Sequence, residues 1–242
     1  MRIVAKTDIG RIRNSNQDSY AAGELPNGVA WAVVCDGMGG TSGGNVASST
    51  AVKIISEKIT SLYRNGMSPL SIKNMLVSAI NAANISVYDM SRANEELEGM
   101  GTTVVCTVVV DSVAYIAHAG DSRAYAVSEQ EVIQLTKDHS VVQELVEKGE
   151  ITVAQAKHHP NKNLITRALG VDPDIKIDYC EYYINNNDIV ILCTDGLTNF
   201  VDSEVFENII ENNPYYQIAD LLVSKANENG GGDNITVVAL SY

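Results

Sequence analysis

The sequence predicts an α+β fold in which antiparallel sheets stack on each other and helices cover the outer faces. Short runs rich in β-branched residues, bounded by glycine or aspartate, indicate buried strands, and two longer segments carry helical periodicity. Four predicted strands follow one another on short turns between residues 103 and 135, which favours antiparallel hairpins over parallel βαβ units. The 242 residues are expected to form a single domain, 1–242.

Strands are the more numerous of the predicted elements. The clearest are the apolar runs 29–35, 103–110 and 188–193. Further strands are predicted at 2–7, 17–22, 113–119, 122–128, 131–135, 175–183 and 234–241.

Two amphipathic helices are predicted between the first strands and the central run of strands. Apolar positions recur at helical spacing from 47 to 62 and again from 72 to 90. Ser68 is the expected N-cap of the second helix, and Pro69 its first residue. Shorter helical pairs are expected at 140–148 with 152–157 and at 203–211 with 214–228.

Composition and charge exclude several classes of protein. Seventeen basic against thirty acidic residues give a net charge of −13, which argues against a nucleic-acid partner. No apolar run approaches the ~20 residues that span a bilayer, and an acid at position eight leaves no room for a secretory signal. The four cysteines form no Cys-x-x-Cys pair, which indicates free thiols. We therefore expect a cytoplasmic protein with no membrane partner.

Two Asp-Gly pairs, Asp36-Gly37 and Asp195-Gly196, directly follow predicted buried strands. A carboxylate at a strand end, beside a glycine that permits close backbone approach, can be presented to a hard cation. The alternative for either pair alone is a turn residue that ends a strand.

Three more aspartates also abut apolar strands. Asp233 follows a glycine triplet, which is costly to order without a geometric reason, although a flexible linker is the alternative. Asp121 sits between two apolar strands, where a two-residue Gly-Asp hairpin turn is the alternative. Asp18 opens a predicted strand, where a polar edge residue is the alternative. Acids gathered at one end of stacked sheets would repel one another unless cations neutralised them, and oxygen ligands favour Mg²⁺ or Mn²⁺.

Taken together, these segments resemble the PP2C (PPM) family of metal-dependent protein serine/threonine phosphatases, in its compact bacterial form. The matching segments run in the family's order along nearly the whole chain. They are Arg13-Asn14-Ser15-Asn16-Gln17-Asp18, Val34-Cys35-Asp36-Gly37-Met38-Gly39-Gly40, Gly101-Thr102-Thr103, Ala119-Gly120-Asp121-Ser122-Arg123, Asp138-His139, Leu164-Ile165-Thr166-Arg167-Ala168-Leu169-Gly170, Leu192-Cys193-Thr194-Asp195-Gly196-Leu197 and Gly232-Asp233-Asn234-Ile235-Thr236.

The resemblance implies a four-layer α-β-β-α sandwich with a binuclear Mn²⁺ or Mg²⁺ centre at one end. By matching position, Asp36 would bridge both metals and the Gly37 carbonyl would complete one shell. Asp195 and Asp233 would bind the other metal, with Asp18 behind them holding metal-bound water. The third, weaker metal of bacterial members would map onto Asp121 with Asp195.

The resemblance also implies a mechanism. Arg13 matches the family's phosphate-binding arginine, whose guanidinium fork suits two phosphate oxygens. A water molecule bridging the metals would attack phosphorus in line, without a phosphoenzyme intermediate. Animal members carry a histidine where this chain has Met38, so the proton donor is open. His158 and His159 are candidates, in a segment matching the family's mobile flap at about 140–165, and a metal-bound water is the alternative.

The predicted partners are phosphorylated proteins, including a bacterial serine/threonine kinase, and we expect a monomer. Two other functions stay open. A pseudophosphatase would bind phosphoproteins without turnover, but it would lack a metal ligand, and none is missing. A two-metal phosphodiesterase or nuclease also gathers aspartates, but the net charge of −13 opposes it.

Overall fold

Two antiparallel sheets form the centre of the molecule. The computed structural model describes residues 1–40, 43–128 and 131–241. The five-stranded sheet has the order β1 (Arg2–Asp8), β11 (Ile235–Ser241), β10 (Ile189–Cys193), β7 (Arg123–Val127), β8 (Val132–Gln134). The six-stranded sheet has the order β2 (Asp18–Leu25), β3 (Val29–Met38), β5 (Val104–Val110), β6 (Val113–Ala119), β9 (Asp178–Tyr183), with the short β4 (Gly101–Thr102) paired to β3.

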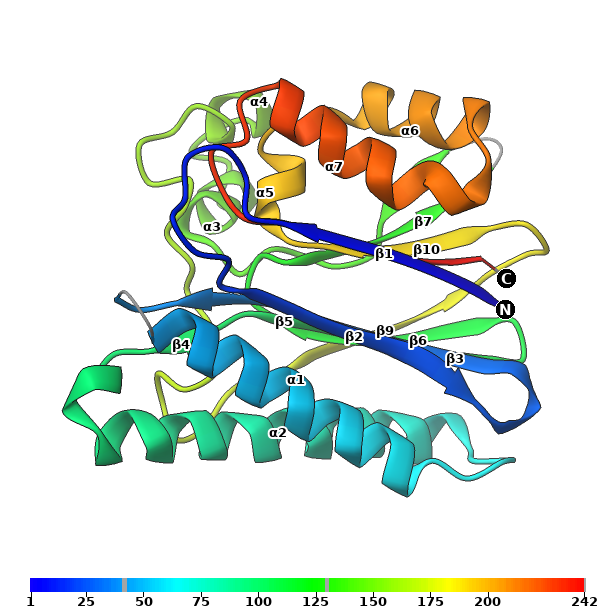
Figure 1. Cartoon of the computed structure of the whole chain (residues 1–242), viewed down its shortest axis with the longest axis horizontal. Helices are drawn as coiled ribbons and strands as arrows, with labels where there is room; N and C mark the ends of the chain where they lie inside the picture. Colours follow the sequence, from blue (N-terminus) through cyan, green and yellow to red (C-terminus); the bar gives the residue numbers. More distant parts are fainter. Residues whose placement is uncertain (41–42, 129–130, 242) are drawn as a thin grey trace.

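Helices cover the outer face of each sheet, which confirms the predicted four-layer sandwich (Figure 1). Helices α1 (Gly43–Leu62) and α2 (Pro69–Ala93) lie on the six-stranded sheet, and α6 (Ser203–Asn212) and α7 (Ile218–Glu228) lie on the other. Ser68 is the N-cap of α2, because its hydroxyl accepts from the Ser71 amide at 3.2 Å. No helix in the described part of the chain is long and apolar enough to cross a membrane.

The continuous apolar run of β3 is explained by its two buried faces. Val29, Trp31, Val33 and Cys35 pack against α1 and α2, whereas the residues between them pack against the facing sheet. A strand buried on both faces loses the polar–apolar alternation of a surface strand. All four cysteines are free thiols, as the sequence predicted; Cys35, Cys106 and Cys193 are buried, whereas Cys180 is half-buried.

The structure corrects three predictions about local elements. Strand β3 continues to Met38, since β4 pairs with Gly37 and Met38, so Asp36 lies within a strand rather than at its end. Asp195 opens a short helix, α5 (Asp195–Thr198). The helix expected at 214–228 begins as a 3₁₀ turn, Tyr215–Gln217, and becomes α-helical only at Ile218.

The crossing from β6 to β7 also differs from the hairpin alternative. Strand β6 pairs with β5 and β9, while β7 pairs with β10 and β8. The two strands belong to different sheets, so Gly120 and Asp121 carry the chain from one sheet to the other. A two-residue hairpin turn at this point is therefore wrong.

The helical segment after β8 lies at one end of the sandwich. It contains α3 (Val141–Glu147) and α4 (Val153–Ala156), and its two ends meet in a β-bridge between Ser140 and Ile165. The loop after β1, which carries Arg13, reaches the same end of the molecule (Figure 1). We call residues 140–165 the flap.

Candidate metal centre

The five aspartates singled out from the sequence lie at the end of the sandwich beside the flap. Asp18 opens β2 and is paired across the strands with Asp36. A cleft of about 330 Å³ is lined by Asp36, Asp121, Asp195 and Asp233. Asp18 is buried and is not among the residues that line the cleft. The structure thus brings acids from both sheets to one cleft.

Asp18 is held by two threonine hydroxyl groups, one directly after β10 and one in β11. Its Oδ2 accepts from Thr194 Oγ1 at 2.9 Å and from Thr236 Oγ1 at 2.7 Å. Its Oδ1 is buried and has no hydrogen-bond partner in the structure. A buried carboxylate oxygen without a partner is costly, and a cation or its hydration water would satisfy it.

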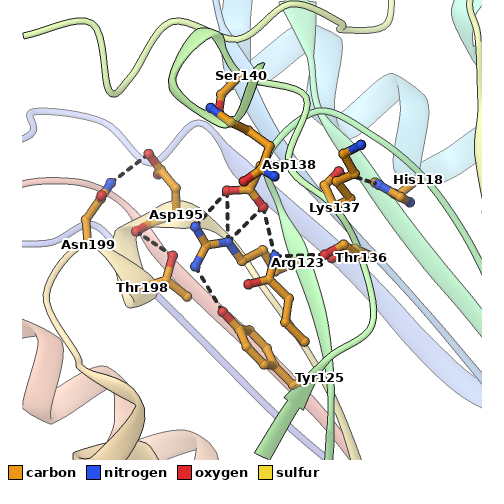
Figure 2. A network of polar contacts seen from close by, with 12 residues as sticks. His118, Arg123, Tyr125, Thr136, Lys137, Asp138, Ser140, Asp195, Thr198 and Asn199 are labelled. Atoms are coloured by element: carbon orange, nitrogen blue, oxygen red, sulfur yellow. Dashed lines mark hydrogen bonds and ion pairs between the residues drawn. The ribbon is translucent and has the colours of Figure 1, made fainter. Parts of the chain in front are cut away.

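Asp195 shows the same asymmetry. Its Oδ2 accepts from the side-chain Nδ2 of Asn199 at 2.9 Å, one turn further along the chain, while its Oδ1 is buried without a partner (Figure 2). Asp18 and Asp195 therefore each keep one oxygen free for a ligand.

The carboxylates raise one another's pKa. Burial and the neighbouring Asp18 and Asp195 carboxylates raise the pKa of Asp36 well above its ordinary range. Burial, with added repulsion from Asp195, raises the pKa of Asp18 to about 7 and that of Asp121 to about 8. Burial and the Asp233 carboxylate raise that of Asp195 to about 6. Without cations these acids cannot all be ionised at neutral pH, so the site fits divalent cations.

Both Asp-Gly glycines allow a close backbone approach. A Cβ on Gly37 would lie 2.0 Å from the Gly44 carbonyl oxygen, and one on Gly196 would lie 1.9 Å from that of Asn234. Any side chain at either position would push the adjacent aspartate away from the cleft. This confirms the close approach expected from the sequence and removes the simple turn as an explanation of these glycines.

The glycine-rich loop before β11 is pinned to the loop after β1. The Arg11 amide donates to the Gly231 carbonyl at 2.7 Å, and Arg13 Nη2 contacts Asp233 Oδ2 at 2.9 Å. Asn234 Nδ2 donates to the carbonyls of Ile9 and Ser15, both at 2.9 Å. These contacts oppose the flexible-linker alternative for the glycines.

Sequence reasoning gave no role to two side chains that position the acids. Thr103 Oγ1 accepts from the Asp36 amide at 2.9 Å, and the Thr103 amide donates to the Asp36 carbonyl at the same distance. Asn234 Oδ1 accepts from the Gln17 amide at 2.8 Å, next to Asp18. Both residues stand in the matching motifs, and Asn234 also directly follows Asp233. Membership of these motifs was the available signal.

The two candidate proton donors lie away from the acids. His158 is exposed, His159 is half-buried, and His159 Nδ1 accepts from the Asn161 amide at 3.1 Å within the flap. The flap residues that line the cleft are Asn163 and Ile165. Neither histidine is thus brought next to the aspartates.

A separate histidine group lies behind the cleft. Ligand atoms of His118, His139 and Asp178 lie within 4.8 Å of one another, which is metal-site spacing. However, Arg167 Nη1 lies 2.9 Å from both His139 Nε2 and Asp178 Oδ1. The arginine already supplies the positive charge there, so this group is less suited to a metal than the cleft.

The fold and its acid-lined cleft define a metal-dependent hydrolase of the four-layer sandwich type. A sequence model described as protein phosphatase 2C matches residues 11–220. The serine/threonine phosphatase Stp of Listeria monocytogenes is 38% identical over 237 residues, covering 96% of this chain and 92% of the relative. The Streptococcus agalactiae serine/threonine phosphatase structure superposes with a TM-score of 0.92 at 32% identity, covering 98% of each chain.

The structure of the PstP catalytic domain with two manganese ions is also similar. Its TM-score is 0.85 at 30% identity, covering 98% of this chain and 96% of that one. The chain therefore belongs to the protein phosphatase 2C family. It is a metal-dependent protein serine/threonine phosphatase, and its substrates are phosphoproteins.

Proposed function

We propose that the cleft holds two divalent cations, Mn²⁺ or Mg²⁺. The Asp36 carboxylate, the Gly37 carbonyl and the Asp195 and Asp233 carboxylates would hold them, with Asp36 shared between the two. The observation that carries this proposal is the unpartnered, buried carboxylate oxygen of Asp195 among acids that cannot all ionise alone. The two manganese ions of the similar PstP structure support it.

A third, weaker cation belongs at Asp121 together with Asp195. Asp121 is buried at the sheet crossing and lines the same cleft. Asp18 stands behind this group, and its unpartnered Oδ1 would accept a hydrogen bond from water of the cations' hydration shell. These assignments use all five aspartates that were singled out from the sequence.

Arg13 binds the phosphoryl group of the substrate. Its guanidinium is exposed at the cleft and directed by Asp233, so nitrogens not used by Asp233 can face two phosphoryl oxygens. When bound, the cations lower the pKa of the attacking water and offset charge on the phosphoryl oxygens.

The reaction is a direct hydrolysis at phosphorus. The water oxygen forms the new bond to phosphorus, the bond to the serine or threonine oxygen breaks, and that oxygen leaves with a proton. His158 or His159 serves as the proton donor, and for this the flap must carry one of them toward the cleft. Neither histidine lines the cleft in this structure.

We further propose that the protein acts as a monomer in the cytoplasm and reverses the work of a serine/threonine kinase, including on the kinase itself. The naming of relatives as serine/threonine phosphatases supports the substrate chemistry. A pseudophosphatase is not favoured, because the relatives are named as phosphatases and no acid is missing. A nuclease is not favoured, because the chain carries a net charge of −13.

The direct test is phosphate release from phosphothreonine peptides with Mn²⁺. The wild type should release phosphate, and chelation of Mn²⁺, Asp36→Ala and Asp195→Ala should each suppress release by several orders of magnitude. No Mn²⁺-dependent release by the wild type across several peptides would overturn the enzymatic function. Cleavage of nucleic acid under the same conditions would favour the nuclease instead.

A further inference from the structure

Two consecutive residues, Asp138 and His139, hold the two ends of residues 120–123, the segment that contains Asp121 and crosses between the sheets. His139 contacts Gly120 on one side of Asp121, and Asp138 contacts Arg123 on the other side. Asp138, Arg123 and Asp195 lie close together in one view of this end of the sandwich (Figure 2). Neither Asp138 nor His139 has a role in the mechanism described above.

His139 holds Gly120 through both its main chain and its side chain. Its amide donates to the Gly120 carbonyl at 2.9 Å, and its Nδ1 accepts from the Gly120 amide at 3.1 Å. Nδ1 therefore carries no proton and Nε2 carries one, which points toward Asp178 Oδ2 at 3.2 Å. Arg167 Nη1, which lies 2.9 Å from the same nitrogen, cannot donate to it in this tautomer and donates to Asp178 Oδ1 instead. Burial lowers the pKa of His139 to about 4, so this neutral tautomer persists at neutral pH.

Asp138 holds Arg123 with a two-point contact. Arg123 Nε and Nη2 donate to the two carboxylate oxygens of Asp138 at 2.9 and 2.6 Å, and its Nη1 donates to Tyr125 Oη at 3.0 Å. The fixed guanidinium anchors the main chain two residues after Asp121.

The crossing segment has little freedom on its other side. Gly120 has a φ of +115°, and a Cβ there would lie 2.6 Å from Thr103 Cβ. Ser122 Oγ lies 2.7 Å from Thr103 Oγ1, the same oxygen that accepts from the Asp36 amide. Asp121 is thus fixed between Thr103, which also orients Asp36, and the Asp138-His139 pair.

The same pair forms the base of the flap. The Thr166 amide donates to the His139 carbonyl at 2.7 Å, and the next residue, Ser140, bridges to Ile165. The chain therefore enters the flap directly after His139, which holds Gly120, and leaves it at Thr166, whose amide is bonded to His139. A displacement of the flap base would therefore shift Asp121, because His139 makes two hydrogen bonds to the adjacent Gly120.

We propose that Asp138 and His139 are positioning residues that hold the Asp121 carboxylate at the cleft and link its position to the flap. The proposal rests on the assignment of a third, weaker cation to Asp121 in the proposed function. Residues behind a ligand commonly change metal affinity about 10- to 100-fold when they are replaced.

The test is calorimetric titration of the full chain with Mn²⁺. His139→Ala should lower the affinity of the weakest Mn²⁺ binding step about 10- to 100-fold. Asp121→Asn, which removes the proposed ligand itself, should lower the affinity of the same step. His139→Asn should restore this step toward wild type, because its Oδ1 can accept from the Gly120 amide. If His139→Ala does not fold, Asp138→Asn is used in its place and should weaken the same step.

A matched control separates this effect from general destabilisation. Tyr215→Phe removes the hydroxyl that bonds to the Arg2 carbonyl near the chain ends, and it should lower the melting temperature without changing Mn²⁺ binding. A folded His139→Ala or Asp138→Asn that titrates like wild type would overturn the proposal. An Asp121→Asn variant with an unchanged Mn²⁺ titration would also overturn it. The same holds if His139→Asn binds Mn²⁺ as weakly as His139→Ala at this step.

The tighter Mn²⁺ steps and phosphate release by the wild type, measured on the same preparations, test the proposed function separately. Normal activity together with an unaltered His139→Ala titration would remove the positioning role alone.

Discussion

Arg13 Nη2 lies 2.9 Å from Asp233 Oδ2, so the proposed phosphate-binding arginine is paired with a proposed cation ligand. The arginine side chain is half exposed, which limits the stability that this pair can contribute. Its value is geometric, because Asp233 directs the guanidinium along the cleft. A cation on Asp233 would weaken this pairing and free more of the guanidinium for the substrate.

Arg13→Ala should lower kcat/KM for a phosphothreonine peptide about 10- to 100-fold, as expected for losing a charged hydrogen-bond donor worth about 1.5–3 kcal/mol. Arg13→Lys should recover only part of this loss, because a lysine cannot hold two phosphoryl oxygens in a fork. Steady-state kinetics at saturating Mn²⁺ provides the measurement. Equal kinetics for wild type and Arg13→Ala would remove the phosphate-binding role.

Gly196→Ala should destabilise the protein by at least about 3 kcal/mol, because overpacking of this kind has few ways to relax. The added methyl would meet the Asn234 carbonyl oxygen at 1.9 Å. Gly99→Ala is the matched control. Its φ of +73° opposes a side chain but nothing lies within 4 Å, so it should cost only about 1–2 kcal/mol. Denaturant unfolding of both variants compares them, and similar losses would contradict the close approach.

The free energy of unfolding of the metal-free protein should fall as the pH rises from 6.5 to 8. In the folded state Asp18 and Asp121 have pKa values of about 7 and 8, whereas unfolded aspartates are already ionised. The folded state therefore binds more protons than the unfolded state, and stability is lost as these acids ionise. The expected loss is about 1–2 kcal/mol. Burial lowers the pKa of both His118 and His139, so near pH 6.5 the unfolded state binds more protons at these histidines, and they offset part of the loss.

Denaturant unfolding after chelation measures this dependence, with Asp121→Asn as the variant that should flatten it. Added Mn²⁺ should stabilise the protein more at pH 8 than at pH 6.5, because protons compete with the cation for the same carboxylates. Stability that stays level or rises between these values in the metal-free protein would contradict the crowding of the acids.

The architecture was predictable because its signals are local. The apolar run 29–35 and the helical spacing of residues 72–90 each reflect burial of their own segment. The proximity of the acids was not predictable from the residues themselves, because Asp18 and Asp195 meet only through the stacking of two sheets. The resemblance to the family motifs supplied this proximity as an expectation.

What the motifs left out are contacts between segments. No spacing in the sequence indicates that β3 passes through Asp36 to pair with β4, or that residues 120–121 cross between sheets. The hydrogen bond between His139 and Gly120 joins a buried side chain to the main chain of a residue 19 positions earlier in the sequence. Such contacts depend on tertiary packing, which local propensity does not encode.

The most direct test of the central claim is a crystal grown with Mn²⁺ and measured at an X-ray energy where manganese scatters anomalously. Two strong anomalous peaks should lie in the cleft, one within coordination distance of Asp36 and the Gly37 carbonyl, the other of Asp36, Asp195 and Asp233. A weaker third peak is expected beside Asp121. A cleft without peaks, or manganese found instead between His118, His139 and Asp178, would contradict the account.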